Sequence, residues 1–172
     1  MSFYLRIINK NRWYRSNQPT WLPHNEIPAQ PLADVVPKPE ENLSLWLIEN
    51  DKSNLNRVAA AVASTREKLD KLDYALFPIE IIDQLGLTVA KSPGKTLDDD
   101  ANSDWHWDLI QLTANKATLL AKELYAKAEI TRLWPEEVQQ LIREEIRLNH
   151  LIKAKLKAKL QADLNEEHSS PL

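Results

Sequence analysis

The residues with the clearest chemical potential surround His106, which lies between two tryptophans in the stretch SDWHWDLIQL (103–112). An imidazole can act as a metal ligand or as a general base near neutral pH. Helical spacing, however, aligns His106 with Ile110 and Leu120 in the middle of an apolar arc. A histidine in that position is usually buried, with its ring nitrogens hydrogen-bonded inside the protein. We therefore expect His106 to be packed in the core, and an enzyme or ligand-binding site centred on His106 is an alternative.

The acidic run before His106 partly matches the spacing of an EF-hand calcium loop. The match covers the first, third and fifth loop positions, which are Asp98, Asp100 and Asn102. It fails where the motif is strictest, because Ser103 replaces the turn glycine and Leu109 replaces the bidentate glutamate. No second histidine lies one helical turn from His106. We predict no metal site, and expect Asp98–Asp100 and Asp104 to mark the start of a helix, where carboxylates favour the positive end of the dipole.

Several kinds of catalytic chemistry are excluded by the sequence. The chain has no cysteine, so thiolate nucleophiles, thiolate metal sites and disulfides are absent. The stretch SPGKT (92–96) ends like a phosphate-binding loop, but Val89 stands where the first glycine is required, and a turn is the better interpretation. We find no nucleophile elbow and no pair of metal-binding histidines. The sequence therefore predicts a protein that is not an enzyme and that needs no cofactor.

Basic residues at the two ends of the chain offer one binding function. Arg6, Arg12 and Arg15 are interleaved with aromatic rings, and the first 25 positions carry no acidic residue. Cations that neutralise phosphates, beside rings that stack on bases, are typical of single-strand nucleic-acid binding. Lys155 and Lys159 belong to a second basic segment near the C-terminus. A nucleic-acid-binding accessory protein that uses these five residues is the first alternative function.

The preferred function is a non-enzymatic protein–protein interaction protein, a subunit or adaptor of a larger intracellular complex. A proline-rich arm and an overlong final helix both need surfaces that the chain itself lacks. Tryptophans often anchor interfaces, and leucine or isoleucine every fourth residue gives the last helix an apolar stripe. The candidate partner-binding residues are Trp13, Trp21, Trp46, Ile152, Leu156 and Leu160. The partner is another protein or a second copy of the chain, with no membrane span.

The elements that would position these residues define an α+β fold that is predominantly helical. Alternating or apolar runs predict strands over 3–9, 42–51, 73–77 and 87–92. A helix is expected over 54–72, and a short one from Pro78 is closed by Gly86. Two long helices, 103–130 and 135–165, should follow as a hairpin. The predicted architecture is thus a small, mainly antiparallel sheet in the N-terminal half with one or two helices, and then a long C-terminal helical hairpin.

Length and composition place these elements in one domain, residues 1–172. Its expected parts are an N-terminal strand region (1–17), a proline-rich extended arm (18–41), a small sheet with helices (42–98), two long helices (103–165) and a frayed tail (166–172). The hydrophobic content of 43% is enough for one core, and the net charge of −3 favours neither nucleic acid nor membrane. No long apolar run or signal peptide is evident, so we expect a soluble, cytoplasmic protein.

Overall fold

A single antiparallel sheet organises the chain. The computed structural model describes residues 2–13, 26–37 and 42–165. Within these ranges six strands pair in the order β4-β5-β2-β1-β3-β6. The strands are β1 (Phe3–Ile7), β2 (Leu43–Ile48), β3 (Leu72–Pro78), β4 (Thr88–Lys91), β5 (His106–Ile110) and β6 (Glu129–Leu133). The first three occupy the centre, and β4 and β6 form the edges.

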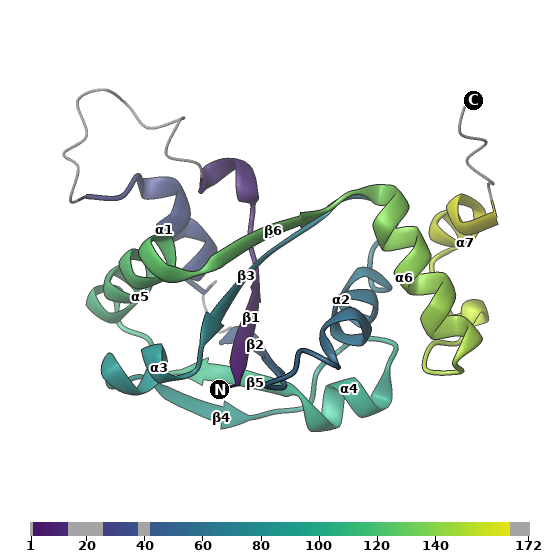
Figure 1. The fold of residues 1–172 in the computed structure, drawn as a ribbon. Coiled ribbons are helices and arrows are strands. Elements are labelled where there is room, and N and C mark those ends of the chain that lie inside the picture. The colour runs from purple at the N-terminus through teal and green to yellow at the C-terminus, as the bar shows by residue number, and fades with distance from the viewer. Residues whose placement is uncertain (1, 14–25, 38–41, 166–172) are drawn as a thin grey trace.

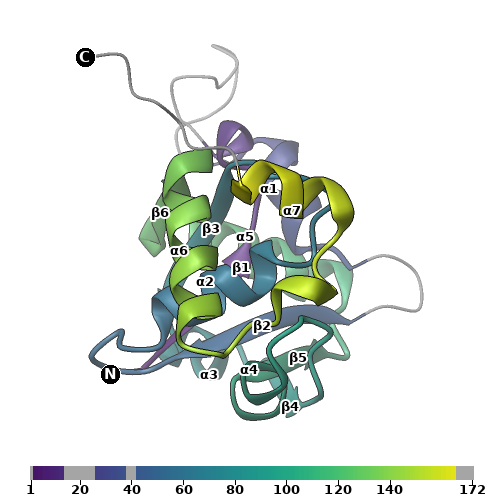
Figure 2. The same cartoon turned by 90° about the vertical axis from the view of Figure 1, so that its right-hand side faces the viewer.

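Helices cover both faces of this sheet. They are α1 (Ala29–Val35), α2 (Leu55–Ala63), α3 (Glu80–Gln84), α4 (Asp99–Asp104), α5 (Ala114–Lys127), α6 (Pro135–Arg147) and α7 (Ala158–Asn165), with short 3-10 turns η1 (Lys10–Arg12) and η3 (Lys153–Lys155). Helices α1 and α5 lie on one side, and α2, α6 and α7 lie on the other (Figure 1). The view turned by 90° shows the second group in front of the sheet (Figure 2).

The alternation of side chains along each strand creates the two cores. In β2, Leu43 and Leu45 pack on the α1 and α5 side, whereas Trp46 and Ile48 pack on the α2 side. Successive strand residues point to opposite faces, so a strand buried on both sides has no polar face. On the α2 side, alanines of α2 let that helix approach the sheet closely, with Ala60 and Ala61 fully buried.

The structure contradicts the predicted fold class. The protein is α+β, but its sheet is neither small nor confined to the N-terminal half, because β5 and β6 follow residue 103. The predicted helix over 103–130 contains α4, β5, α5 and the start of β6. The predicted helix over 135–165 is divided into α6, η3 and α7. The helices are therefore distributed along the chain, and there is no long C-terminal hairpin in the described residues.

Local chemistry explains why the long helices are interrupted. In HWDLI, polar His106 and Asp108 alternate with apolar Trp107 and Leu109. This is the period of a strand, but the run is too short to distinguish from a helical arc. Gln111 then takes a left-handed backbone conformation (φ 54°), and the Thr113 side chain caps α5. A second left-handed residue, Asn149 (φ 63°), follows α6. Such residues end regular elements.

Predictions for the rest of the chain were more accurate. The strands expected near 3–9, 42–51, 73–77 and 87–92 are confirmed, as are the short helix before Gly86 and the helix start at Pro135. The helix expected over 54–72 ends early, at Ala63. The extended arm predicted over 18–41 is wrong for 29–35, which form α1. Residues 18–25 and 38–41 of the arm lie outside the described structure. Pro31 fits in α1 because it lies in the first turn, where backbone N–H groups have no helical partner.

A buried ion pair joins the central strand β3 to the edge strand β6. Asp73 accepts hydrogen bonds from Arg132 Nε at 2.7 Å and Arg132 Nη2 at 2.8 Å, and from the Lys10 backbone N–H at 2.9 Å. Burial alone would raise the pKa of Asp73, but these hydrogen bonds and the Arg132 charge outweigh burial and hold the pKa below its usual value. The charged form of Asp73 therefore stabilises the fold.

The last helices close the core on the α2 side. Leu156 and Leu160 are buried against Val138 and Ile142 of α6 and against alanines of α2. Arg143 also donates from Nη2 to the Leu164 carbonyl at 2.6 Å. Among the described residues, no helix is long and apolar enough to cross a membrane.

Candidate functional site

His106 begins β5 and is fixed by the loop that follows β4. Its Nδ1 lies 3.0 Å from the Ser92 carbonyl oxygen and 3.0 Å from Ser92 Oγ. A carbonyl oxygen can only accept, so we assign a proton to Nδ1, which then donates to the Ser92 carbonyl. The ring of Trp46 packs edge-on against the imidazole at 4.8 Å between centroids. The side chain of His106 is only 8% exposed, as expected for a packed residue, although it lies on a strand and not on a helix.

The other ring nitrogen of His106 makes no hydrogen bond in the described structure, and its charged neighbour is Asp108. Its Nε2 lies 4.0 Å from Asp108 Oδ1, which is beyond hydrogen-bond distance. Asp108 lies two residues along β5, so both side chains project from the same face of the sheet. The Asp108 carboxylate is 19% exposed and receives one long hydrogen bond, from Ser44 Oγ at 3.5 Å. Two hydrogen-bond acceptors therefore face the same side without a close donor.

These two acceptors lie in a polar pocket of about 550 Å³ on the α2 side of the sheet. Cross-strand pairing brings the floor together, because Trp46 is opposite His106 and Ser44 is opposite Asp108. The end of α2 supplies Val62 and Thr65, and the loop after β4 supplies further lining. The complete lining is Ile7, Asn42, Ser44, Trp46, Val62, Thr65, Pro93, Lys95, Thr96, His106 and Asp108. The site therefore combines hydroxyls, one cation, one carboxylate and an imidazole with an apolar wall.

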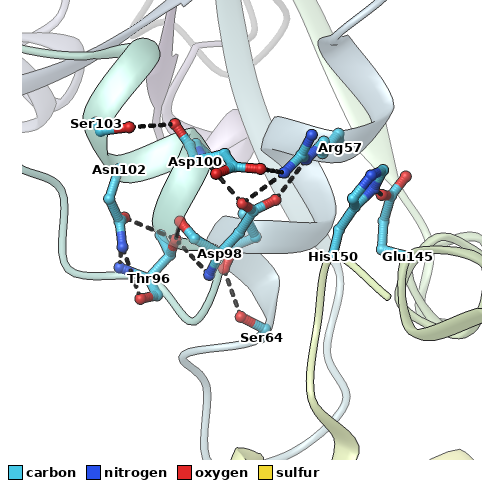
Figure 3. A network of polar contacts seen from close by, with 11 residues as sticks. Arg57, Ser64, Thr96, Asp98, Asp100, Asn102, Ser103, Glu145 and His150 are labelled. Atoms are coloured by element: carbon cyan, nitrogen blue, oxygen red, sulfur yellow. Dashed lines mark hydrogen bonds and ion pairs between the residues drawn. The ribbon is translucent and has the colours of Figure 1, made fainter. Parts of the chain in front are cut away.

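The loop that borders this pocket, residues 92–98, is held by Asn102 of α4 (Figure 3). Asn102 Oδ1 accepts from the Thr96 backbone N–H at 2.9 Å and from Thr96 Oγ1 at 2.8 Å, while Asn102 Nδ2 donates to the Thr96 carbonyl at 2.9 Å. The Gly94 N–H donates to the Asn102 carbonyl at 3.0 Å. A loop tied at so many points presents Lys95 and Thr96 to the pocket in a defined geometry.

An ion pair between α2 and α4 completes this support. Arg57 donates to Asp98 through Nε at 2.6 Å and through Nη2 at 2.9 Å, and it also reaches Asp100 at 2.8 Å (Figure 3). Asp98 is almost fully buried and caps α4 by accepting from the Ala101 N–H. Burial raises the pKa of Asp98, but the hydrogen bonds and charge of Arg57 outweigh burial and bring the pKa below its usual value. Asp98 therefore stays charged.

Gly94 is required where the loop crosses Trp46. A Cβ built on Gly94 would lie 2.5 Å from Asn102 Oδ1 and 2.9 Å from Trp46 Cη2. The Asn102 oxygen cannot move easily because it accepts two hydrogen bonds from Thr96. Glycine at this position allows the loop to approach the floor of the pocket.

The acidic run has a structural role in α4. Asp98 is the N-cap and Asp99 and Asp100 lie in the first turn, as predicted, whereas Asp104 is the last helical residue and not part of the start. Asp98 and Asn102 are occupied by Arg57 and Thr96, so they do not converge as calcium ligands. In the described parts of the chain, no group of three histidine or acidic side chains could hold a metal ion.

Most of the predicted partner-binding residues lie inside the protein. Trp13 is buried, and its Nε1 donates to Asp34 at 2.7 Å. Trp46 is in the pocket floor, Leu156 and Leu160 are in the core, and Trp21 lies outside the described residues. Ile152 is 51% exposed. Of the six, Ile152 alone is found on the described surface.

The predicted nucleic-acid residues do not form one surface in the described structure. The guanidinium of Arg6 donates to the carbonyls of Asp34 and Ser44, so it serves the fold. The side chain of Arg12 and the whole of Arg15 lie outside the described structure. Lys155 and Lys159 are exposed near the C-terminal end.

Sequence reasoning identified His106 but missed Asp108 as its neighbour. On a helix, residues two apart point in different directions, so the helix predicted over 103–130 would separate Asp108 from His106. On a strand, the same two residues share a face. The alternation in HWDLI was the available signal. Lys95, Thr96 and Ser44 could not be found in this way, because long-range folding brings them to the site.

Comparison with family models, with curated proteins and with solved structures finds no match to this chain.

Proposed function

We propose that this protein binds a small polar ligand in the pocket around His106. The observation that supports this proposal most directly is the pair of acceptors at its floor. His106 Nε2 has no hydrogen-bond partner in the described structure, and the Asp108 carboxylate has only the 3.5 Å contact from Ser44. Neither residue is among those with a fully buried, unpartnered side-chain atom, so both acceptors are accessible from the pocket. Acceptors left open in a preformed pocket with a rigid border are typical of a ligand site.

The same geometry favours binding over catalysis. Ser92 Oγ is close to the histidine ring, as a serine nucleophile would be. A base must accept the serine proton, however, and Nδ1 already donates its own proton to the Ser92 carbonyl. In this tautomer the ring nitrogen does not activate Ser92. The expectation that the protein is not an enzyme stays a prediction, and this arrangement supports it.

The experiment is a screen of small polar compounds against the ¹⁵N-labelled protein by NMR. A compound that occupies the pocket should shift the backbone signals of Thr96, His106 and Asp108 together. His106→Asn should weaken binding, because its amide can replace Nδ1–H toward Ser92 while removing Nε2. Asp99→Asn is the matched control, since it removes an exposed charge from α4 outside the pocket lining.

The outcomes are distinct. Pocket shifts that disappear in His106→Asn and persist in Asp99→Asn would support the proposal. A diverse library that leaves the pocket signals unchanged, or a ligand that binds His106→Asn as tightly as the parent protein, would overturn it. The fold of each variant is checked by its spectrum away from the site.

A second proposal keeps the interaction-subunit hypothesis, with the protein working in the cytoplasm. Ile152 is 51% exposed and Leu148 is 43% exposed, on either side of the turn that follows α6. Exposed large apolar side chains are used at protein contacts when they form a patch. Affinity capture from native lysate, with and without nuclease, should recover a stoichiometric partner that Ile152→Glu loses. Recovery of the protein alone would contradict this proposal, and loss of all bound material after nuclease would favour nucleic acid.

A further inference from the structure

The pocket floor restricts the chemistry of the ligand, on the condition that the proposed function is correct. In the tautomer that donates from Nδ1 to the Ser92 carbonyl, the His106 ring presents a lone pair at Nε2. The Asp108 carboxylate also accepts only. Both groups therefore require hydrogen-bond donors from whatever occupies the space between them.

The spacing of the two acceptors favours a donor group with more than one hydrogen. Nε2 and Asp108 Oδ1 are 4.0 Å apart. For a donor atom about 2.9 Å from each acceptor, the acceptor–donor–acceptor angle would be roughly 90°. The N–H bonds of a primary ammonium diverge at about the tetrahedral angle, so two of them can serve both acceptors with slight bending. A hydroxyl has one hydrogen and can serve only one acceptor.

Charge further favours an ammonium. Asp108 is partly buried, and in the described residues no lysine or arginine forms an ion pair with its carboxylate. Hydrogen bonds between ionised groups are shorter and stronger than those between neutral groups. The pocket wall next to the acceptors includes Ile7 and Val62, which are suited to an apolar body attached to the ammonium.

We infer that the ligand carries a primary ammonium group on an apolar body, with the ammonium between His106 Nε2 and the Asp108 carboxylate. Lys95 in the bordering loop would oppose a second cation, so a monoamine or an amino acid is expected and a polyamine is not. A single neutral hydroxyl would satisfy one acceptor at a time.

The test measures affinities for matched pairs of compounds by NMR titration of the full chain. The amines are n-butylamine, phenethylamine and tryptamine, and the partners are 1-butanol, 2-phenylethanol and tryptophol. At least one amine should bind at the pocket about tenfold more tightly than its alcohol, because two charge-assisted bonds replace one neutral bond. Asp108→Asn should remove this preference, since an amide is neutral and also a donor. Asp99→Asn should retain it.

Failure of the inference is distinguishable from failure of the proposed function. If the alcohols bind at the pocket as tightly as the amines, or if Asp108→Asn leaves the preference unchanged, the ammonium assignment is overturned while a ligand pocket remains. If none of the amines binds but neutral compounds from the wider screen shift Thr96 and His106, the assignment is likewise overturned. If no compound in the whole screen shifts the pocket signals, both the ammonium assignment and the proposed function are overturned.

Discussion

Replacing Arg57 with methionine should destabilise the protein strongly at neutral pH. The substitution keeps an unbranched side chain of similar length but removes the donors to Asp98 at 2.6 and 2.9 Å. Asp98 is only 2% exposed, so its carboxylate would be left buried and without a cation. Removing one partner of a buried ion pair costs about 3 to 5 kcal/mol. We expect the lower value, about 3 kcal/mol, because the hydrogen bond from Ala101 remains.

The assay is urea unfolding followed by circular dichroism. With a slope of about 2 kcal/mol per molar urea, the midpoint should fall by roughly 1.5 M at pH 7. In the variant, burial is no longer opposed by Arg57, so the pKa of Asp98 should rise and the carboxyl should become neutral at mildly acidic pH. The destabilisation relative to the parent should therefore be smaller near pH 4 than at pH 7. Asp98→Asn in the same chain should recover part of the loss.

The control is Arg147→Met, which breaks a similar two-point contact with Glu144 on the exposed surface of α6. Exposed pairs of this kind contribute little. Equal midpoints for Arg57→Met and Arg147→Met, or a loss in Arg57→Met that does not depend on pH, would refute the reasoning about the buried pair.

Three further predictions follow from the packing. Gly94→Ala should destabilise the protein by about 1 to 3 kcal/mol through overpacking and should weaken ligand binding, and an unchanged midpoint with unchanged pocket signals would contradict the tight approach of the loop. The pKa of Asp73 is lowered on folding, so the stability that Asp73 contributes is complete above its unfolded pKa of about 4 and is lost as the pH falls through its folded pKa. The free energy of unfolding should therefore depend less on pH between pH 7 and pH 3 in Asp73→Asn than in the parent. Parallel pH profiles for the two proteins would contradict this role of Asp73. Leu160→Ala should lower the free energy of unfolding by about 2 to 5 kcal/mol, whereas Ile152→Ala should change it little. Similar losses for the two variants in thermal unfolding would contradict the placement of α7.

Local patterns predicted the N-terminal half of the fold well. The apolar run of β2 and the glycine that closes the turn after α3 each have one plausible structure, so the sequence was sufficient there. The same reasoning failed after residue 103. The segment containing His106 fits both the periodicity of a helix and that of a strand. Its pairing with β2, more than fifty residues away in the chain, makes it a strand.

The site was predictable only in part for the same reason. His106 was singled out by its position between tryptophans, but its neighbours come from β2, from the end of α2 and from the loop after β4. The β6 strand illustrates the general limit. Its residues Glu129–Leu133 become an edge strand because β3 offers an unpaired side, and no local signal reports that. Tertiary pairing therefore determined both the missing strands and the missing site residues.

The most direct test of the central claim is a crystal structure of the protein with phenethylamine bound. We predict the amine nitrogen within hydrogen-bond distance of both His106 Nε2 and the Asp108 carboxylate, with the phenyl ring in the same pocket beside Val62. The account would be contradicted if the uncharged part of the ligand filled the space between His106 and Asp108, or if the amine were bound at another surface.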